Sequence, residues 1–270
     1  MLGAREAGCT GLSVGLGGSA TSDGGGGMAQ ALGVKLLGED GGELRRGAAA
    51  LMSLEHIDMA KRDPRVASAK IYAASDVTNP LCGPKGAAAV YSPQKGADEK
   101  MVGMLDKALG KLATVIEQDL GVSVRDLAGA GAAGGLGAGL VAFCGAEIRS
   151  GPNLVLEMLD FEGYLESADL VFTGEGKVDR QVEFGKAISG VSLLAGKHGV
   201  PVIAFAGNLE EEPEKLADRG IGGVVPICLG PMEEQEAMAR AGDLLQGAAE
   251  RTMRLLMMGR GLGDGLWPTM

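Results

Sequence analysis

Residues 12–25 read Leu-Ser-Val-Gly-Leu-Gly-Gly-Ser-Ala-Thr-Ser-Asp-Gly-Gly, and this stretch decides the class of fold. Leu12, Val14 and Leu16 alternate with small residues, which predicts a short, half-buried strand. Glycines and hydroxyl residues follow, and Asp23 is a good helix-capping residue, so we expect a helix to open near it. A strand, a glycine-rich turn and a helix in this order are typical of an α/β protein.

The same succession of strands and helices recurs along the chain and predicts two α/β domains with largely parallel sheets. Further strands are expected at 70–74, 170–173, 202–205 and 224–228, and helices at 98–118, 185–198, 211–218 and 233–257. The residues expected on the inner face of the last helix are Met238, Ala241, Leu245, Ala248 and Leu256. The chain becomes polar between 152 and 166, which suggests a boundary there. We expect a glycine-rich α/β domain over 1–155, a Rossmann- or flavodoxin-like βα domain over 156–258, and a flexible tail over 259–270.

Composition excludes several classes of function. The 270 residues carry a net charge of −10, which argues against binding to nucleic acid because phosphates require a basic surface. Arg5 and Glu6 interrupt the amino terminus, so no signal peptide is expected and the predicted location is cytoplasmic. Residues 127–146 are uncharged but hold seven glycines, which favours a loop followed by a buried helix over a membrane span.

The loop after the first strand is the first candidate site. Gly17, Gly18, Ser19 and Thr21 would expose backbone N–H groups at the start of a helix, where anions bind. The loop has neither the Gly-Lys-Ser/Thr of a Walker A motif nor the dinucleotide fingerprint, which disfavours a dinucleotide-dependent oxidoreductase. A tight strand-to-helix turn without a ligand explains the same residues equally well.

Two further candidates lie in the first half of the chain. Asp76 comes after the predicted strand 70–74 and Ser75, at the sheet edge where α/β proteins bind ligands, and Asn79 begins an Asn-Pro turn. Asp76 could hold Mg²⁺ or accept a hydroxyl proton, or it could merely cap the turn. Lys95, in Ser-Pro-Gln-Lys-Gly, could neutralise a phosphate or a carboxylate, or it could be a solvated lysine.

The fourth candidate is Thr-Gly-Glu-Gly-Lys-Val-Asp at 173–179, where a strand is expected to end in glycines and acids. Glu175 and Asp179 could bind a metal or act as a base, and Lys186 could face a phosphate. Taken together, the four segments supply the groups that phosphoryl transfer needs, namely amides and cations for charge, carboxylates for Mg²⁺ and a base near the attacking hydroxyl.

Five motifs in this order resemble those of the bacterial type I glycerate kinases (glycerate 2-kinase). They are Gly-Leu-Gly-Gly-Ser-Ala-Thr-Ser-Asp-Gly-Gly at 15–25, Asp-Val-Thr-Asn-Pro-Leu-Cys-Gly at 76–83, Pro-Gln-Lys-Gly-Ala at 93–97, Gly-Ala-Gly-Ala-Ala-Gly-Gly-Leu-Gly at 129–137 and Thr-Gly-Glu-Gly-Lys-Val-Asp at 173–179. The resemblance extends from about Leu2 to Met257. It implies ATP-dependent phosphorylation of D-glycerate to 2-phosphoglycerate with Mg²⁺, in a cleft between two α/β domains.

For a kinase, residue type and position in the loops assign exchangeable roles to the candidate residues. The catalytic candidates are Asp76, Asp179 and Glu175; the substrate- and phosphate-binding candidates are Gly17, Gly18, Ser19, Thr21, Asn79, Lys95 and Lys186; and the magnesium candidates are Asp76 and Glu175. The expected ligands are ATP, Mg²⁺ and D-glycerate, with no nucleic acid and no membrane as partners.

The chain also departs from the family's pattern. Family members begin with a segment that carries Pro-Asp-Ser-Phe/Tyr-Lys and then Ala-Asp-Gly-Gly-Glu-Gly, and neither motif occurs here. We therefore expect the N-terminal segment to be missing and both sheets to be incomplete. Ser22 stands where the family commonly has Asn, and Ser92 where Gly is common. Three interpretations remain open: an active kinase, a non-catalytic remnant that binds a nucleotide or an organic acid, and half of a split kinase. A homodimer also remains open.

Overall fold

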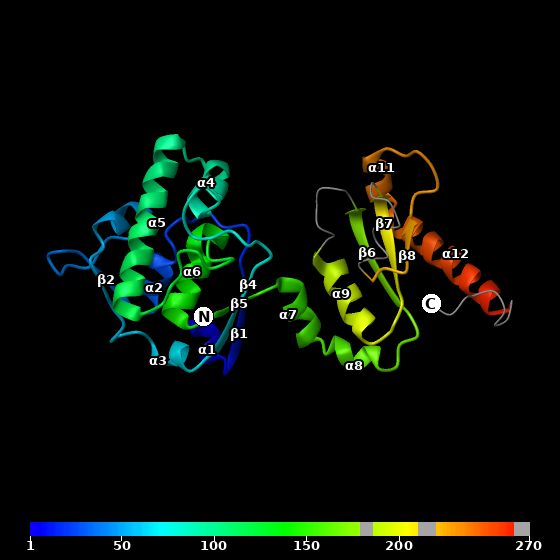
Figure 1. Ribbon diagram of the computed structural model, residues 1–270, viewed down its shortest axis with the longest axis horizontal. Coiled ribbons are helices and arrows are strands. Elements are labelled where there is room, and N and C mark those ends of the chain that lie inside the picture. Colours follow the sequence, from blue (N-terminus) through cyan, green and yellow to red (C-terminus); the bar gives the residue numbers. More distant parts are fainter. Residues whose placement is uncertain (179–185, 210–219, 262–270) are drawn as a thin grey trace. The chain divides into compact units, whose positions relative to one another are not determined.

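The computed structural model describes residues 1–178, 186–209 and 220–261. It divides into two compact units, Met1–Gly151 and Pro152–Met270. Each unit contains a three-stranded parallel sheet and helices, which confirms the predicted α/β class (Figure 1). The domain limits expected from the sequence remain a prediction.

The first unit is built around a sheet with the strand order β1-β4-β5. Its elements, where η marks a 3₁₀ helix, are α1 (Leu2–Glu6), β1 (Gly11–Gly15), α2 (Gly26–Ala31), β2 (Lys35–Leu37), η1 (Ala48–Ser53), β3 (His56–Asp58), α3 (Pro64–Ala67), β4 (Lys70–Ala74), α4 (Ala87–Tyr91), η2 (Pro93–Lys95), α5 (Glu99–Leu120), α6 (Ala132–Cys144) and β5 (Glu147–Arg149). Gly15 on β1 lies opposite Ala74 on β4, so these two strands end together at one edge of the sheet. The strands β2 and β3 form a separate antiparallel pair, which the sequence did not suggest.

One face of this sheet carries the core of the unit. Ile71 and Ala73 of β4 are buried, whereas Lys70 is exposed and Tyr72 is half-buried, as expected for alternating side chains on a strand. The helices α5 and α6 lie on the same side of the sheet (Figure 1). The buried face of α5 consists of Ala108, Leu109, Leu112, Ala113, Val115 and Ile116.

The helix α5 has clear signals at both ends. The Asp98 side chain accepts a hydrogen bond from the Met101 backbone N–H at 2.8 Å, which caps the N-terminus. Gly121 follows the last turn in the left-handed conformation with φ of 68°, which ends the helix. The helix predicted over 98–118 is therefore confirmed, and in the structure it extends to Leu120.

The glycine-rich stretch 127–146 forms a turn and the buried helix α6, as expected. No helix in the part of the chain that the structure describes combines the length and apolarity needed to cross a bilayer.

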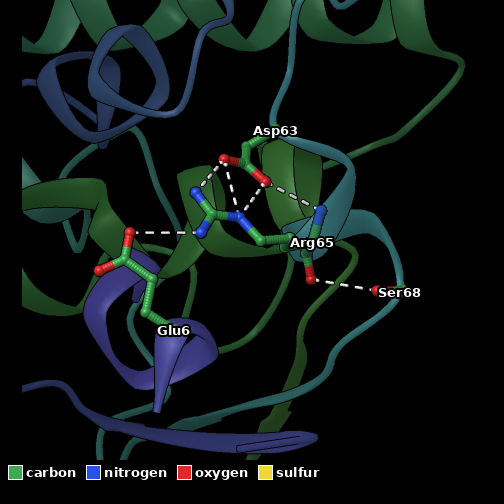
Figure 2. A network of polar contacts seen from close by, with 4 residues as sticks. All are labelled: Glu6, Asp63, Arg65 and Ser68. Carbon is green, nitrogen blue, oxygen red and sulfur yellow. Dashed lines mark hydrogen bonds and ion pairs between the residues drawn. The ribbon is translucent and has the colours of Figure 1, made fainter. Parts of the chain in front are cut away.

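A polar network joins α1 to α3 at one end of the first unit (Figure 2). The Arg65 guanidinium contacts Glu6 at 3.3 Å and Asp63 at 2.7 Å. The Asp63 carboxylate also accepts the Arg65 backbone N–H at 2.9 Å and so caps α3, and Ser68 donates to the Arg65 carbonyl. Hydrogen bonds from Arg65 lower the pKa of Asp63 to about 2, so this carboxylate stays ionised well into acid.

The second unit is built around a sheet with the strand order β6-β7-β8, parallel throughout. Its elements are α7 (Gly151–Met158, which begins at the last residue of the first unit), α8 (Phe161–Leu165), β6 (Val171–Val178), α9 (Lys186–Lys197), β7 (Val202–Leu209), β8 (Gly223–Pro226), α11 (Glu234–Ala239) and α12 (Ala241–Gly261). Ile188 of α9 packs with Ala204 and Ala206 of β7 in a small core. The helix expected over 211–218 lies outside the described residues.

The prediction of one helix over 233–257 is wrong in two respects. It is two helices, because the backbone at Arg240 leaves the helical region with φ of −106° and ψ of 12°. The second helix, α12, continues to Gly261, past the expected start of the tail at 259. Its buried residues are Leu244, Ala248 and Thr252, so of the predicted inner face only Ala248 is buried.

Candidate functional site

The loop that follows β1 is held tightly at both ends. At its start, the Leu16 backbone N–H donates to the Ala74 carbonyl at 2.9 Å, continuing the pairing of β1 with β4. At its end, the Asp23 carboxylate accepts the N–H groups of Gly25 at 3.1 Å and Gly27 at 2.9 Å. Asp23 thus closes the loop onto α2, which begins at Gly26. This confirms that a helix opens close to Asp23.

Between these ends, the predicted anion-binding residues lie at the surface. Gly17, Gly18 and Thr21 are exposed and Ser19 is half-buried. Gly18 has a φ of 58°, a conformation that glycine adopts without the steric cost that other residues incur. The loop therefore presents its backbone to solvent at the carboxyl edge of the sheet.

Lys95, at the end of η2, reaches this loop from a segment distant in sequence. Its ammonium donates to Ser19 Oγ at 2.9 Å and to the Thr21 carbonyl at 2.6 Å. Partial burial lowers the pKa of Lys95, an effect that the negative charge of Asp23 opposes. Both hydrogen-bond acceptors are neutral, so the lysine brings a partly desolvated positive charge to the loop.

β4 ends at Ala74, and Asp76 follows one residue later, after Ser75, as the sequence indicated. Its side chain is exposed. Its Oδ1 accepts the Gly151 backbone N–H at 3.1 Å, at the start of α7. The carboxylate thus holds the point at which the chain leaves the first unit. Its exposure leaves it accessible to a ligand or a cation.

Asn79 is held in a way that a ligand-binding role would not suggest. Its Nδ2 donates to the Lys85 carbonyl at 2.8 Å, and its Oδ1 accepts the Tyr91 hydroxyl at 2.6 Å. Both ends of the amide are therefore engaged inside the protein. Sequence reasoning missed Tyr91, although it lies directly before the Ser-Pro-Gln-Lys motif that carries Lys95.

The turn that begins α6 packs against both loops. The Gly131 N–H donates to the Asn79 carbonyl at 3.0 Å, and the Gly24 N–H donates to the Gly134 carbonyl at 3.1 Å. A Cβ added at Gly134 would lie 2.0 Å from the Thr21 carbonyl oxygen. Only glycine allows the backbones to come this close, which explains the glycine run at 129–137.

A second contact between segments joins two serines. Ser22 Oγ lies 3.2 Å from Ser92 Oγ, and Ser92 is buried. Both serines stand at positions where the family commonly has another residue, Asn for Ser22 and Gly for Ser92.

The candidates in the second unit take other positions. The strand expected to end at 173 continues as β6 to Val178, so Glu175 lies within a strand and not in the loop after it. It is half-buried and pairs in register with Ala206 of β7. Lys186 is the first residue of α9. Asp179 lies outside the described residues.

The structure thus brings Ser19, Thr21 and Lys95 together and places Asn79 in an adjoining loop. Within residues 1–178, 186–209 and 220–261, no three His, Cys, Asp or Glu residues gather as a metal cluster. A carboxylate such as Asp76 still fits Mg²⁺, because this cation is usually held by one or two carboxylates together with substrate phosphates and water.

Comparison with known proteins identifies relatives over nearly the whole chain. The glycerate kinase of Halalkalibacterium halodurans is 46% identical over 249 residues, which are 92% of this chain and 66% of the relative. The glycerate 2-kinase of Escherichia coli K12 is 42% identical over 259 residues, which are 96% of this chain and 68% of the relative. The chain therefore spans about two thirds of the length of the curated relatives it matches.

Comparison with solved structures points to the same family. A crystal structure from Salmonella typhimurium LT2 that carries the name glycerate kinase 2 has a TM-score of 0.84 and 41% sequence identity, and the match covers 96% of this chain and 68% of that one. The pattern of the glycerate kinase family matches residues 1–257. The chain belongs to the glycerate kinase family.

Proposed function

We propose that this chain catalyses the transfer of the ATP γ-phosphoryl group to D-glycerate, giving 2-phosphoglycerate and ADP, with Mg²⁺. Membership of the glycerate kinase family supports the reaction class. The single observation that carries the proposal is the contact of the Lys95 ammonium with Ser19 and Thr21 in the loop that follows β1.

The chemistry of that contact suits a phosphate. A triphosphate needs donors and positive charge that are already in place, because phosphoryl transfer depends on positioning and on charge stabilisation. The exposed backbone of Gly17 and Gly18 supplies N–H donors, and Lys95 supplies a compact cation already oriented by two hydrogen bonds. In this proposal the loop and Lys95 bind the phosphates of ATP.

The neighbouring loop, 76–83, would then receive D-glycerate. Asp76 is exposed at the end of β4, where it would accept the proton of the attacking hydroxyl or hold Mg²⁺. If Asp76 held the cation, its positive charge would offset negative charge that develops during transfer. Glu175, Asp179 and Lys186 remain proposed contributors from the second unit, as metal ligand, base and phosphate contact.

The test is a coupled assay of ADP formation by the 270-residue chain with ATP, D-glycerate and Mg²⁺, with the product identified by ³¹P NMR. We expect 2-phosphoglycerate as the product. Lys95→Met should raise the dissociation constant for ATP at least tenfold in calorimetry, because the charge is lost from the loop. The matched control is Lys100→Met, at an exposed lysine on the first turn of α5.

The outcomes separate the alternatives. ATP binding that depends on Lys95 without turnover would favour the non-catalytic binding protein. Turnover that appears only when an N-terminal fragment is added would favour half of a split kinase. Unchanged ATP binding in Lys95→Met would remove Lys95 from the site.

A further inference from the structure

Two consecutive residues at the end of α4 reach toward different loops of the candidate site. Tyr91 is the last residue of α4, and Ser92 follows it and leads into η2, which ends at Lys95. The Tyr91 hydroxyl contacts Asn79 in loop 76–83, and the Ser92 hydroxyl contacts Ser22 in the loop after β1. Two neighbouring residues, Tyr91 and Ser92, therefore contact the two loops that the proposed function assigns to two different ligands.

Tyr91 fixes the orientation of the Asn79 amide. Its hydroxyl donates to Asn79 Oδ1 at 2.6 Å, so the amide nitrogen is directed to the Lys85 carbonyl, to which it donates at 2.8 Å. Partial burial raises the pKa of Tyr91, so the phenol stays protonated and remains a donor at neutral pH. The Asn79 carbonyl is held as well, by the Gly131 N–H at 3.0 Å. Loop 76–83 is therefore pinned through one residue.

Ser92 is the corresponding support for the other loop. It is 1% exposed, and its carbonyl accepts the N–H groups of Lys95 at 3.0 Å and Ala97 at 3.1 Å. These bonds shape the short segment that carries Lys95. Its hydroxyl lies 3.2 Å from Ser22 Oγ, so the same residue shapes η2 and contacts the loop that Lys95 reaches.

We propose that Tyr91 and Ser92 are positioning residues that act on different substrates, Tyr91 on D-glycerate through Asn79 and Ser92 on ATP through Ser22. The inference rests on the proposed function, because it assigns the two loops to those two ligands. Neither side chain is required to touch a substrate. Each holds a loop whose geometry decides how well one ligand is bound, and rigid support of this kind is what orients reacting groups.

The test compares Tyr91→Phe and Ser92→Ala in the full chain, with KM and kcat measured for each substrate and dissociation constants measured by calorimetry. Tyr91→Phe should raise the KM and Kd for D-glycerate about three- to tenfold, the effect of losing about one net hydrogen bond, and change those for ATP less than twofold. Ser92→Ala should raise the KM and Kd for ATP about three- to tenfold and change those for D-glycerate less than twofold. The matched controls are Tyr164→Phe and Ser123→Ala, at exposed side chains, and both should leave all constants unchanged.

A double-mutant cycle then tests the route of action. If Tyr91 acts only through Asn79, the variant Tyr91→Phe/Asn79→Ala should match Asn79→Ala within twofold for D-glycerate. A merely structural role would lower the amount of active protein and affect both substrates alike.

Three results decide the matter. The substrate split together with a non-additive cycle supports the inference. Equal effects on both substrates, or multiplicative effects in the cycle, overturn it while leaving the kinase activity standing. A wild-type chain that neither binds nor turns over ATP and D-glycerate overturns the proposed function, and the inference with it.

Discussion

In both units an apolar run is followed by glycines and an acidic residue, but the strand ends there in the first unit and continues in the second. In the first unit, β1 ends at Gly15 and the chain leaves the sheet, with Gly18 in the left-handed region and Asp23 closing the loop onto α2. In the second unit, β6 continues through Gly174 and Gly176 to Val178. Glycines and acids after an apolar run therefore do not by themselves end a strand.

Contacts outside the motif explain the difference. The loop after β1 is covered by the turn of α6, because the Gly134 carbonyl accepts the Gly24 N–H. On β6, Gly176 faces Gly207 of β7, where a Cβ added at Gly207 would lie 2.5 Å from the Gly176 carbonyl oxygen. Gly207 lets two backbones approach in the second unit, and Gly134, in the turn of α6, does so in the first. The packing around the end of an apolar run thus decides whether the chain turns away or continues as a strand.

The largest expected effect comes from closing the space beside the first loop. Gly134→Ala would place a Cβ 2.0 Å from the Thr21 carbonyl oxygen, at a residue with φ of 69°. Because backbone and not a flexible side chain lies in the way, we expect a loss of at least about 2 kcal/mol in the free energy of unfolding. Urea unfolding followed by circular dichroism measures it. The control is Gly103→Ala on α5, where nothing lies within 4 Å, and it should be neutral or slightly stabilising.

The matching change in the second unit should be smaller. Gly207→Ala brings a Cβ to 2.5 Å from the Gly176 carbonyl oxygen, and the two strands must move apart slightly. We expect a loss of about 1–2 kcal/mol, measured by the same unfolding experiment. Gly223→Ala on β8, where the closest atom would be 3.9 Å away, serves as the control. A loss equal to that of Gly134→Ala would mean that both glycine contacts are equally rigid.

Chemical function should separate from stability at Asp76. Asp76→Asn retains an oxygen that accepts the Gly151 N–H but removes the charge proposed for Mg²⁺ or for the hydroxyl proton. We therefore expect turnover to fall more than tenfold while the urea midpoint stays unchanged. Asp58→Asn is the matched control, because Asp58 also accepts a backbone N–H, that of Ala60, away from both loops. Unchanged turnover in Asp76→Asn would exclude Asp76 from the chemistry.

Local signals in the sequence predicted the elements whose boundaries depend on a few neighbouring residues. The strand 70–74 matches β4 residue for residue, and α5 begins after Asp98 as its capping pattern indicates. The loop after β1 was also placed correctly, because a glycine run and an aspartate define it locally.

Features that depend on packing could not be read from the sequence. The last helix offers more than one apolar stripe, and the stripe that is buried holds Leu244, Ala248 and Thr252, with a threonine in place of the expected leucines. Tyr91 gave no signal because its role exists only once Asn79 lies beside it. Beyond 173, β6 stays paired with β7 and lies close to Gly207, more than thirty residues away in the sequence.

The smallest expected effect is a loss of stability in acid that is confined to the first unit. Asp63 of the first unit has its pKa lowered from 3.8 to about 2 by hydrogen bonds from Arg65. A carboxyl whose pKa is lower in the folded state stabilises the fold above its unfolded pKa, and that contribution disappears as the pH falls through the folded value. The urea midpoint of wild type should therefore exceed that of Asp63→Asn by a constant amount above about pH 5, and the gap should shrink between about pH 4 and pH 2. Hydrogen exchange should place the loss in residues 2–9 and 63–68, next to the network of Figure 2, and leave β6 to β8 unaffected. A gap that stays constant down to pH 2 would show that Arg65 does not hold the Asp63 charge in the folded state.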